Sequence, residues 1–363
     1  MPKIVERRSS RSSGIELLRI IAMVMIVAYH LSTHVSWQNL SGANKYYITA
    51  LSYLGRIGVA IFFMITGYFL ARQKKFDWKK IFVVIRPTWF YSWLFLGLAF
   101  IFKDEKAVLT FPMSPYLLRS IFPILSNSYW FISSYVVMML LSPYIKKWLD
   151  TLKEKELSRV LMILFVSSFA ARMINLILGD SPTAILEMPI GFFYIVLGYT
   201  MRFYEKRFTF KQGLFGILLS AGFILLAPLV EWLFRRVGYN MPPSFFSDIY
   251  SPLTLIAAIS LFLVFSKATI KSKVINYFSS HTFGVYLIHE NIFLAPIIWN
   301  TNRIFSISER AGSGTLSFIA YTIFVVATVY FCSTALEILR KLSARLIIFI
   351  ANKRKTRTAT AKR

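Results

Sequence analysis

Long apolar runs separated by short polar segments make up most of the chain. A helix needs about 20 mainly apolar residues to cross roughly 30 Å of hydrocarbon. Runs of this kind predict ten membrane spans, near residues 15–34, 53–71, 81–102, 122–145, 158–178, 184–203, 213–234, 249–266, 280–300 and 316–338. The expected fold is therefore all-α, a polytopic transmembrane helical bundle of about ten helices.

Composition supports this fold class and limits the partners. Hydrophobic residues make up 56% of the chain and charged residues 16%, and the mean hydropathy is +0.58. A soluble protein of this length would have to expose many of these side chains, so a lipid bilayer is the expected surroundings. The net charge of +26 does not indicate nucleic-acid binding, because the basic residues cluster between apolar spans. With a single cysteine, Cys332, no disulfide and no metal site are expected.

The distribution of basic residues predicts the orientation. Of the 42 lysines and arginines, 30 lie in the two tails and in every second loop, and only 10 belong to the alternate loops. The positive-inside rule then places both termini in the cytoplasm, which requires an even number of spans. We predict a basic cytoplasmic tail at 1–13, a membrane domain at 14–338 and a second basic cytoplasmic tail at 339–363. The segment from Lys353 onward is expected to be disordered and held near anionic headgroups.

A polar stripe runs along the first apolar span, which contains Glu16, Arg19 and His30. An arginine inside a membrane helix costs roughly 2.5–3.5 kcal/mol on insertion scales, so such residues mark function by default. On a helix, Arg19 and His30 project from nearly the same face, about 16.5 Å apart along the axis. Histidine is the side chain best suited to move a proton near neutral pH. We therefore select this stripe as the first candidate site.

Other polar residues in the spans allow two interpretations each. His289 and Glu290 fall near the middle of the ninth predicted span, which is expected to pack inside the bundle because adjacent polar residues facing lipid are costly. A structural polar network is the alternative for this pair. Arg86, near the start of the third span, has the alternative of reaching lipid phosphates. Tyr129 and Trp130, which open the fourth span, fit an interfacial aromatic belt equally well.

Five short motifs resemble, in order, those of acyltransferase family 3, a family of integral membrane proteins. They are Glu16-LLR followed after ten residues by His30, then Phe62-FMITGYFL, Arg86-PTWF, Tyr129-WFISSY and Thr282-FGVYLIHE. The resemblance runs from about residue 14 to 338 and covers all ten predicted spans. Thr66 stands in the place of the family's serine. One departure is chemically mild, because Glu16 stands where aspartate is commoner.

The resemblance implies an O-acyltransferase of the bacterial cytoplasmic membrane. Such an enzyme moves an acetyl or related acyl group from acyl-coenzyme A to a hydroxyl of a capsular, exported or other envelope polysaccharide. Acetyl-coenzyme A would be a donor substrate, with no cofactor bound permanently. We assign candidate roles in catalysis to His30, Arg19, Glu16 and His289, in donor binding to Arg19, Arg86, Lys79 and Lys80, and in acceptor binding to Glu290, Tyr129 and Trp130.

Two alternatives stay open at this point. In one chemistry His30 is a general base; in the other an acyl-imidazole on His30 or His289 carries the group before a sugar accepts it. The main rival function is a secondary transporter or flippase, in which the stripe lines a path for a small solute or glycan precursor. Inverted repeats and paired broken helices would favour transport, and neither pattern is evident in the sequence.

Overall fold

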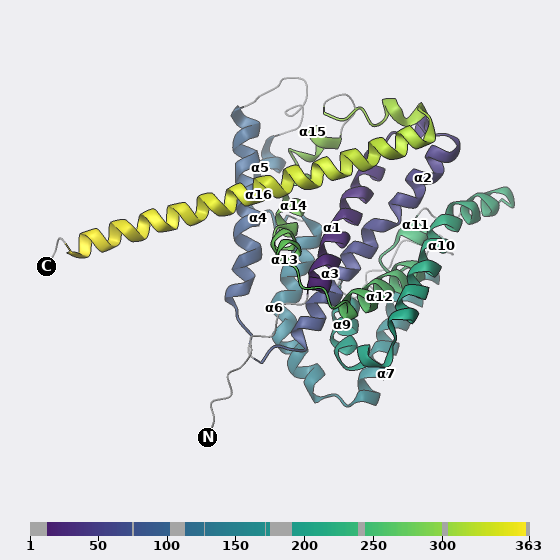
Figure 1. Ribbon diagram of the computed structural model, residues 1–363, viewed down its shortest axis with the longest axis horizontal. Coiled ribbons are helices and arrows are strands. Elements are labelled where there is room, and N and C mark those ends of the chain that lie inside the picture. The colour runs from purple at the N-terminus through teal and green to yellow at the C-terminus, as the bar shows by residue number, and fades with distance from the viewer. Residues whose placement is uncertain are drawn as a thin grey trace.

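The computed structural model describes residues 13–74, 76–101, 113–126, 128–170, 172–174, 191–238, 244–299 and 304–360. Within these ranges the chain is helical, with turns and short irregular connections and no strand. The helices form one bundle, with the first helix near its middle (Figure 1). The expected all-α fold is therefore confirmed.

Three helices form the centre of the bundle: α1 (Ser13–His34), α3 (Leu54–Leu70) and α9 (Phe192–Tyr204). Helix α3 packs against both α1 and α9. Gly67 of α3 and Gly198 of α9 allow a close approach, because a Cβ at either position would clash with a backbone carbonyl of the other helix. Small residues permit such contacts between membrane helices. This packing holds α1 inside the protein, with Glu16 and His30 buried on it.

The other helices surround this centre (Figure 1). Their bounds are α2 (Gly42–Ser52), α4 (Lys79–Ile101), α5 (Met113–Ile121), α6 (Trp130–Thr151), α7 (Glu154–Phe165), α10 (Phe210–Arg236), α11 (Ser244–Ser247), α12 (Pro252–Lys267), α13 (Lys273–Ser279), α14 (Thr282–His289), α15 (Ala295–Trp299) and α16 (Thr315–Thr360). A π-helical turn at Val166–Ala170 follows α7.

Seven helical segments in the described ranges are long and apolar enough to cross a membrane. They are Ser13–His34, Gly42–Leu70, Lys79–Ile101, Glu154–Ile174, Phe210–Arg236, Phe245–Lys267 and Thr315–Lys353. This number supports a multi-pass membrane protein. Part of the sixth predicted span, 184–190, lies outside the described residues. The count of ten and the placement of the termini stay predictions.

The ninth predicted span differs from the structure. Instead of one helix near 280–300, the described part of this region forms the short helices α14 and α15. Helix α14 ends at His289, and Glu290 is its C-cap. The break follows from local chemistry, since the side-chain oxygen of Asn291 accepts a hydrogen bond from the backbone N–H of Phe293, at 3.0 Å. A side chain that bonds the backbone in this way competes with helix continuation.

The C-terminal tail also differs from expectation. Helix α16 continues without interruption from Thr315 to Thr360, so the segment from Lys353 to Thr360 is helical rather than disordered. In Figure 1 the last part of this helix, in yellow, projects beyond the other helices. The three final residues of the chain lie outside the described ranges.

Candidate active site

Two histidines and a glutamate meet inside the bundle. His30 lies on α1, while His289 and Glu290 lie at the end of α14. Nδ1 of His30 is 2.9 Å from Nε2 of His289 and 3.0 Å from Oε1 of Glu290. The two histidines are buried and Glu290 is partly buried. The three side chains form a hydrogen-bonded group, which we call the His–His–Glu triad.

The hydrogen bonds of the triad determine which ring nitrogens carry protons. Nδ1 of His289 lies 2.6 Å from the carbonyl oxygen of Val285, which can only accept, so this nitrogen is the donor. In a neutral imidazole the other nitrogen, Nε2, is then an acceptor. Nδ1–H of His30 therefore donates towards Nε2 of His289 and Oε1 of Glu290. In this assignment Nε2 of His30 holds the free lone pair, which makes it a proton acceptor.

Surrounding contacts hold the irregular chain after α14 in place. The indole N–H of Trp299 donates to the carbonyl oxygen of His289, at 3.2 Å. Asn291 donates from its amide to the hydroxyl of Tyr129 at 2.7 Å, and that hydroxyl donates to the carbonyl oxygen of Leu287 at 3.1 Å. These bonds link both sides of Glu290 to neighbouring helices. They position the carboxylate opposite His30.

A cavity of about 250 Å³ lies against the triad. His30 and Glu290 line it, together with Ile26, Tyr29, Thr33, His34, Gly55, Arg56, Val59, Trp130 and Tyr286. Arg56 lies over the indole ring of Trp130, with the guanidinium carbon 4.5 Å from the ring centroid. The wall therefore offers a cation, an aromatic face and several hydrogen-bonding groups. A polar organic molecule fits such a lining better than a hydrocarbon does.

Glu16 and Arg19 form a separate pair nearer the first residue of α1. Nη1 of Arg19 lies 3.3 Å from each carboxylate oxygen of Glu16, and Glu16 also accepts a hydrogen bond from the hydroxyl of Ser279. The guanidinium lies 5.4 Å from the ring centroid of Phe69. The side chain of Arg19 keeps 26% of its surface exposed, against 2% for Glu16. Arg19 does not line the cavity beside His30.

The other predicted cations lie away from the triad. Arg86 is exposed on α4, with its guanidinium 5.4 Å from the ring centroid of Phe82, beside the exposed rings of Trp89 and Trp93. Lys79 and Lys80 are exposed at the first turn of the same helix. The structure therefore brings His30, His289 and Glu290 together but leaves these three cations on the outer surface of α4.

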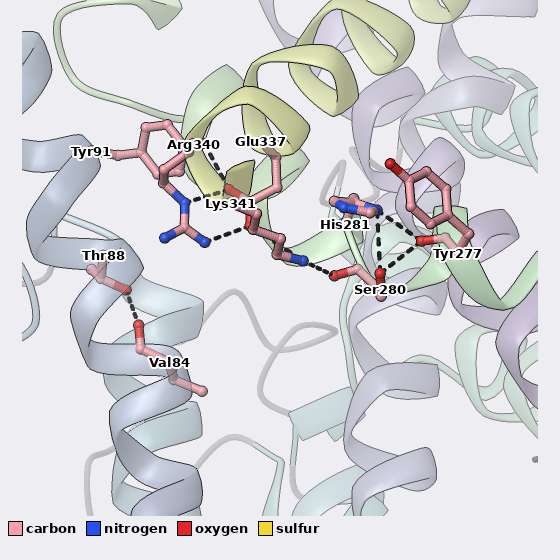
Figure 2. Close-up of polar contacts among 9 residues, drawn as sticks. All are labelled: Val84, Thr88, Tyr91, Tyr277, Ser280, His281, Glu337, Arg340 and Lys341. Atoms are coloured by element: carbon pink, nitrogen blue, oxygen red, sulfur yellow. Dashed lines mark hydrogen bonds and ion pairs between the residues drawn. The ribbon is translucent and has the colours of Figure 1, made fainter. Parts of the chain in front are cut away.

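A second polar cluster ties α16 to the start of α14 (Figure 2). The buried carboxylate of Glu337 accepts two hydrogen bonds from Arg340, both at 2.7 Å, and one from Tyr91 at 2.7 Å. Lys341 donates to the carbonyl oxygen of Ser280 at 2.6 Å. Because Ser279 next to it bonds Glu16, the segment between α13 and α14 joins α1 to α16.

Sequence reasoning did not select Arg56, His34 and Trp299 as site residues. Arg56 and His34 line the cavity, and the ring of His34 stacks on that of Trp299 with 6.1 Å between centroids. Arg56 had a usable signal, since it is a cation in the second apolar run. Trp299 carried none, because one more aromatic side chain in an apolar stretch suggests only packing.

Comparison with known proteins gives one match. Residues 12–337 match the family model of acyltransferase family 3, described as an acyltransferase domain. This range includes α1 to α15, the His–His–Glu triad and the part of α16 up to Glu337. No curated protein and no solved structure matches the chain.

Proposed function

Because the chain belongs to acyltransferase family 3, we propose that it transfers an acyl group, acetyl in the first instance, from acyl-coenzyme A to a carbohydrate hydroxyl. The acceptor is a capsular, exported or other envelope polysaccharide, and the enzyme works in a bacterial cytoplasmic membrane. One observation carries the proposal: His30 lines a cavity while its Nδ1 is engaged by His289 and Glu290. A histidine held in this way is suited to general-base catalysis.

The reaction follows from this arrangement. Nε2 of His30 removes the proton of the sugar hydroxyl as its oxygen attacks the thioester carbonyl, so a C–O bond forms and the C–S bond breaks. The imidazolium of His30 then returns the proton to the departing thiolate of coenzyme A. Glu290 stabilises the imidazolium, because a carboxylate lies 3.0 Å from its Nδ1. His289 holds the ring orientation through its own bond to Nδ1.

Arg19 is the proposed anchor for the anionic donor. With the termini in the cytoplasm, the first turns of α1 face the compartment that contains acyl-coenzyme A. Arg19 keeps part of its side chain exposed there, and Glu16 orients it. Guanidinium groups bind phosphate through paired hydrogen bonds. Three other cations lie outside the cavity: Lys79, Lys80 and Arg86. We propose that they only attract the donor to the membrane surface.

The acceptor sugar is proposed to bind in the cavity beside His30. Trp130 offers a ring face of the kind that packs against sugar C–H groups, and Arg56 offers donors for hydroxyl or acidic substituents. Glu290 also lines the cavity. Tyr129 does not line it, and its hydroxyl bonds the main chain of Leu287, so we propose that Tyr129 positions the triad instead of touching the sugar.

The experiment is a labelling assay on membranes that contain the protein. Membranes are incubated with acetyl-coenzyme A labelled in the acetyl group, and the envelope glycan is isolated and tested for base-labile label. We expect label with the wild-type chain and none with His30→Ala at equal abundance. Unlabelled glycan with the wild-type chain, or full labelling with His30→Ala, contradicts the proposal. Uptake of a solute that depends on His30, without acyl transfer, would favour the transporter instead.

A further inference from the structure

We infer that the His–His–Glu triad is a binding site for a divalent transition-metal ion of the zinc class, and that an ion bound there inhibits acyl transfer. The inhibition rests on the function proposed above, whereas the binding does not. The candidate ligand atoms of His30, His289 and Glu290 all lie within 4.8 Å of one another. The ligands come from opposite ends of the sequence, and only the fold brings them together.

The ligand chemistry fits such an ion. Two imidazole nitrogens and one carboxylate oxygen are a set that binds zinc in enzymes, with the fourth position left open. Zinc lies about 2.0–2.1 Å from these atoms, which places tetrahedral ligands roughly 3.3 Å apart. The recorded separations from Nδ1 of His30 are 2.9 Å to His289 and 3.0 Å to Glu290. These two separations would have to widen by about 0.3–0.4 Å, while the ligand atoms of His289 and Glu290 lie within 4.8 Å of each other.

The ring of His289 is already oriented for this role. Its Nδ1 donates to the carbonyl oxygen of Val285 at 2.6 Å, and metal-binding histidines almost always donate their second nitrogen to such a group. Nε2 is thereby fixed towards His30. Glu290 supplies one negative charge. Arg56 is a cation on the same cavity wall, and it lies over the ring of Trp130. Within the described residues, the ion pair of Glu290 is with His30.

Inhibition follows from the position of one proton. An ion bound to Nδ1 of His30 takes the place of the proton there, and the neutral ring then carries its proton on Nε2. That nitrogen loses the lone pair that removes the proton from the sugar hydroxyl. Two of the three ligands, His30 and Glu290, line the cavity of about 250 Å³. A water molecule on the ion would also occupy space proposed for the acceptor.

The binding test uses Co²⁺ as a spectroscopic probe of the full chain, purified in detergent without a histidine tag. A Cys332→Ser background removes the exposed thiol. We expect visible ligand-field bands of four-coordinate Co²⁺ without thiolate charge transfer, displaced by Zn²⁺. Glu290→Gln and His289→Gln should each weaken Co²⁺ binding by at least about tenfold. His281→Ala is the matched control, because this histidine bonds Tyr277 on α13, and it should leave the spectrum unchanged.

The inhibition test adds Zn²⁺ and then a chelator to the labelling assay. We expect Zn²⁺ to stop acyl transfer and the chelator to restore it. A six-coordinate spectrum, or one that persists in both His289→Gln and Glu290→Gln, overturns the site. Loss of activity on chelation instead of recovery overturns the inhibitory role. A Co²⁺ spectrum that is lost in the triad variants, in a protein that shows no acyl transfer, supports the metal site and contradicts the proposed function. Failure of the metal site and failure of the proposed function are therefore distinguishable.

Discussion

Nε2 of His289 lies 2.9 Å from Nδ1 of His30, although 259 residues separate them in the chain. One ring belongs to the central helix α1 and the other to the last turn of α14. The contact assigns the tautomer of His30 and leaves Nε2 as its free nitrogen.

Replacing His30 with alanine should reduce acyl transfer by about 10²–10⁴-fold, which is the usual contribution of a positioned general base. Initial rates with labelled acetyl-coenzyme A, at matched protein abundance in the membrane, provide the measurement. His281→Ala is the matched control, because this histidine does not line the cavity and bonds the carbonyl oxygen of Tyr277. A rate for His30→Ala close to that of the wild type would remove this ring from the chemistry.

Substitutions of Glu290 should separate orientation from charge. In Glu290→Gln the amide oxygen still accepts from Nδ1 of His30 but no longer stabilises the imidazolium. Since hydrogen bonds to charged groups contribute about 1.5–3 kcal/mol, we expect kcat to fall about 10- to 100-fold. Glu290→Ala also loses the acceptor and should be slower still. Equal rates for the two variants would mean that the charge, and not the hydrogen bond, carries the whole effect.

The two arginines selected from the sequence should behave differently. Arg19→Ala should raise the KM for acyl-coenzyme A by about tenfold or more, because the proposed charge-assisted contact with phosphate would be lost. Arg86→Ala should leave KM and kcat nearly unchanged, because that side chain is exposed on α4 beside Phe82. Steady-state kinetics with varied acyl-coenzyme A tests both. A KM increase confined to Arg86→Ala would place the donor along α4.

Tyr129 and Trp130 should have opposite effects although they are neighbours. Tyr129→Phe leaves the carbonyl of Leu287 and the amide of Asn291 without their recorded partner, at a cost of about 1–3 kcal/mol each at most. We expect a lower unfolding temperature in detergent and an unchanged KM for the acceptor. Trp130→Leu should raise that KM while stability changes little, because Trp130 lines the cavity. The reverse pattern would make Tyr129 the acceptor contact.

Packing between α3 and α9 can be tested with glycine substitutions. Gly198→Ala places a methyl group against the backbone of Met64, and overpacking of this kind costs about 1–3 kcal/mol. Gly222→Ala in α10 is the matched control, since nothing lies within 4 Å of a Cβ at that position. Thermal unfolding in detergent should show a lower transition temperature for Gly198→Ala alone. Equal transitions would show that the two helices separate without cost.

The sequence was informative about the helices and about half of the candidate site. Long apolar runs located α1 and α10 well, and the spacing of Arg19 and His30 selected the stripe, because both signals are local. The pairing of Glu16 with Arg19 also follows from three-residue spacing on a helix. Contacts between residues far apart in the chain leave no such local pattern.

The ninth predicted span contains a helix end that hydropathy did not predict. Hydropathy averages over a window, so it did not register that Asn291 bonds the main chain and ends α14. Because the helix stops there, His289 and Glu290 both reach His30, which two adjacent residues on a continuous helix do poorly. The sequence also did not indicate which way the side chain of Arg86 points, because an apolar helix without a dominant face does not show which side meets lipid.

The length of α16 has a mechanical consequence. At about 1.5 Å per residue, its 46 residues extend for more than twice the thickness of a bilayer's hydrocarbon. The same rod carries Glu337 and Lys341, which hold Tyr91 and the carbonyl of Ser280. A tilt of the projecting end of this continuous helix would therefore also move the part that contacts the bundle. Lys341, in the middle of the helix, ties it to the segment that leads into α14.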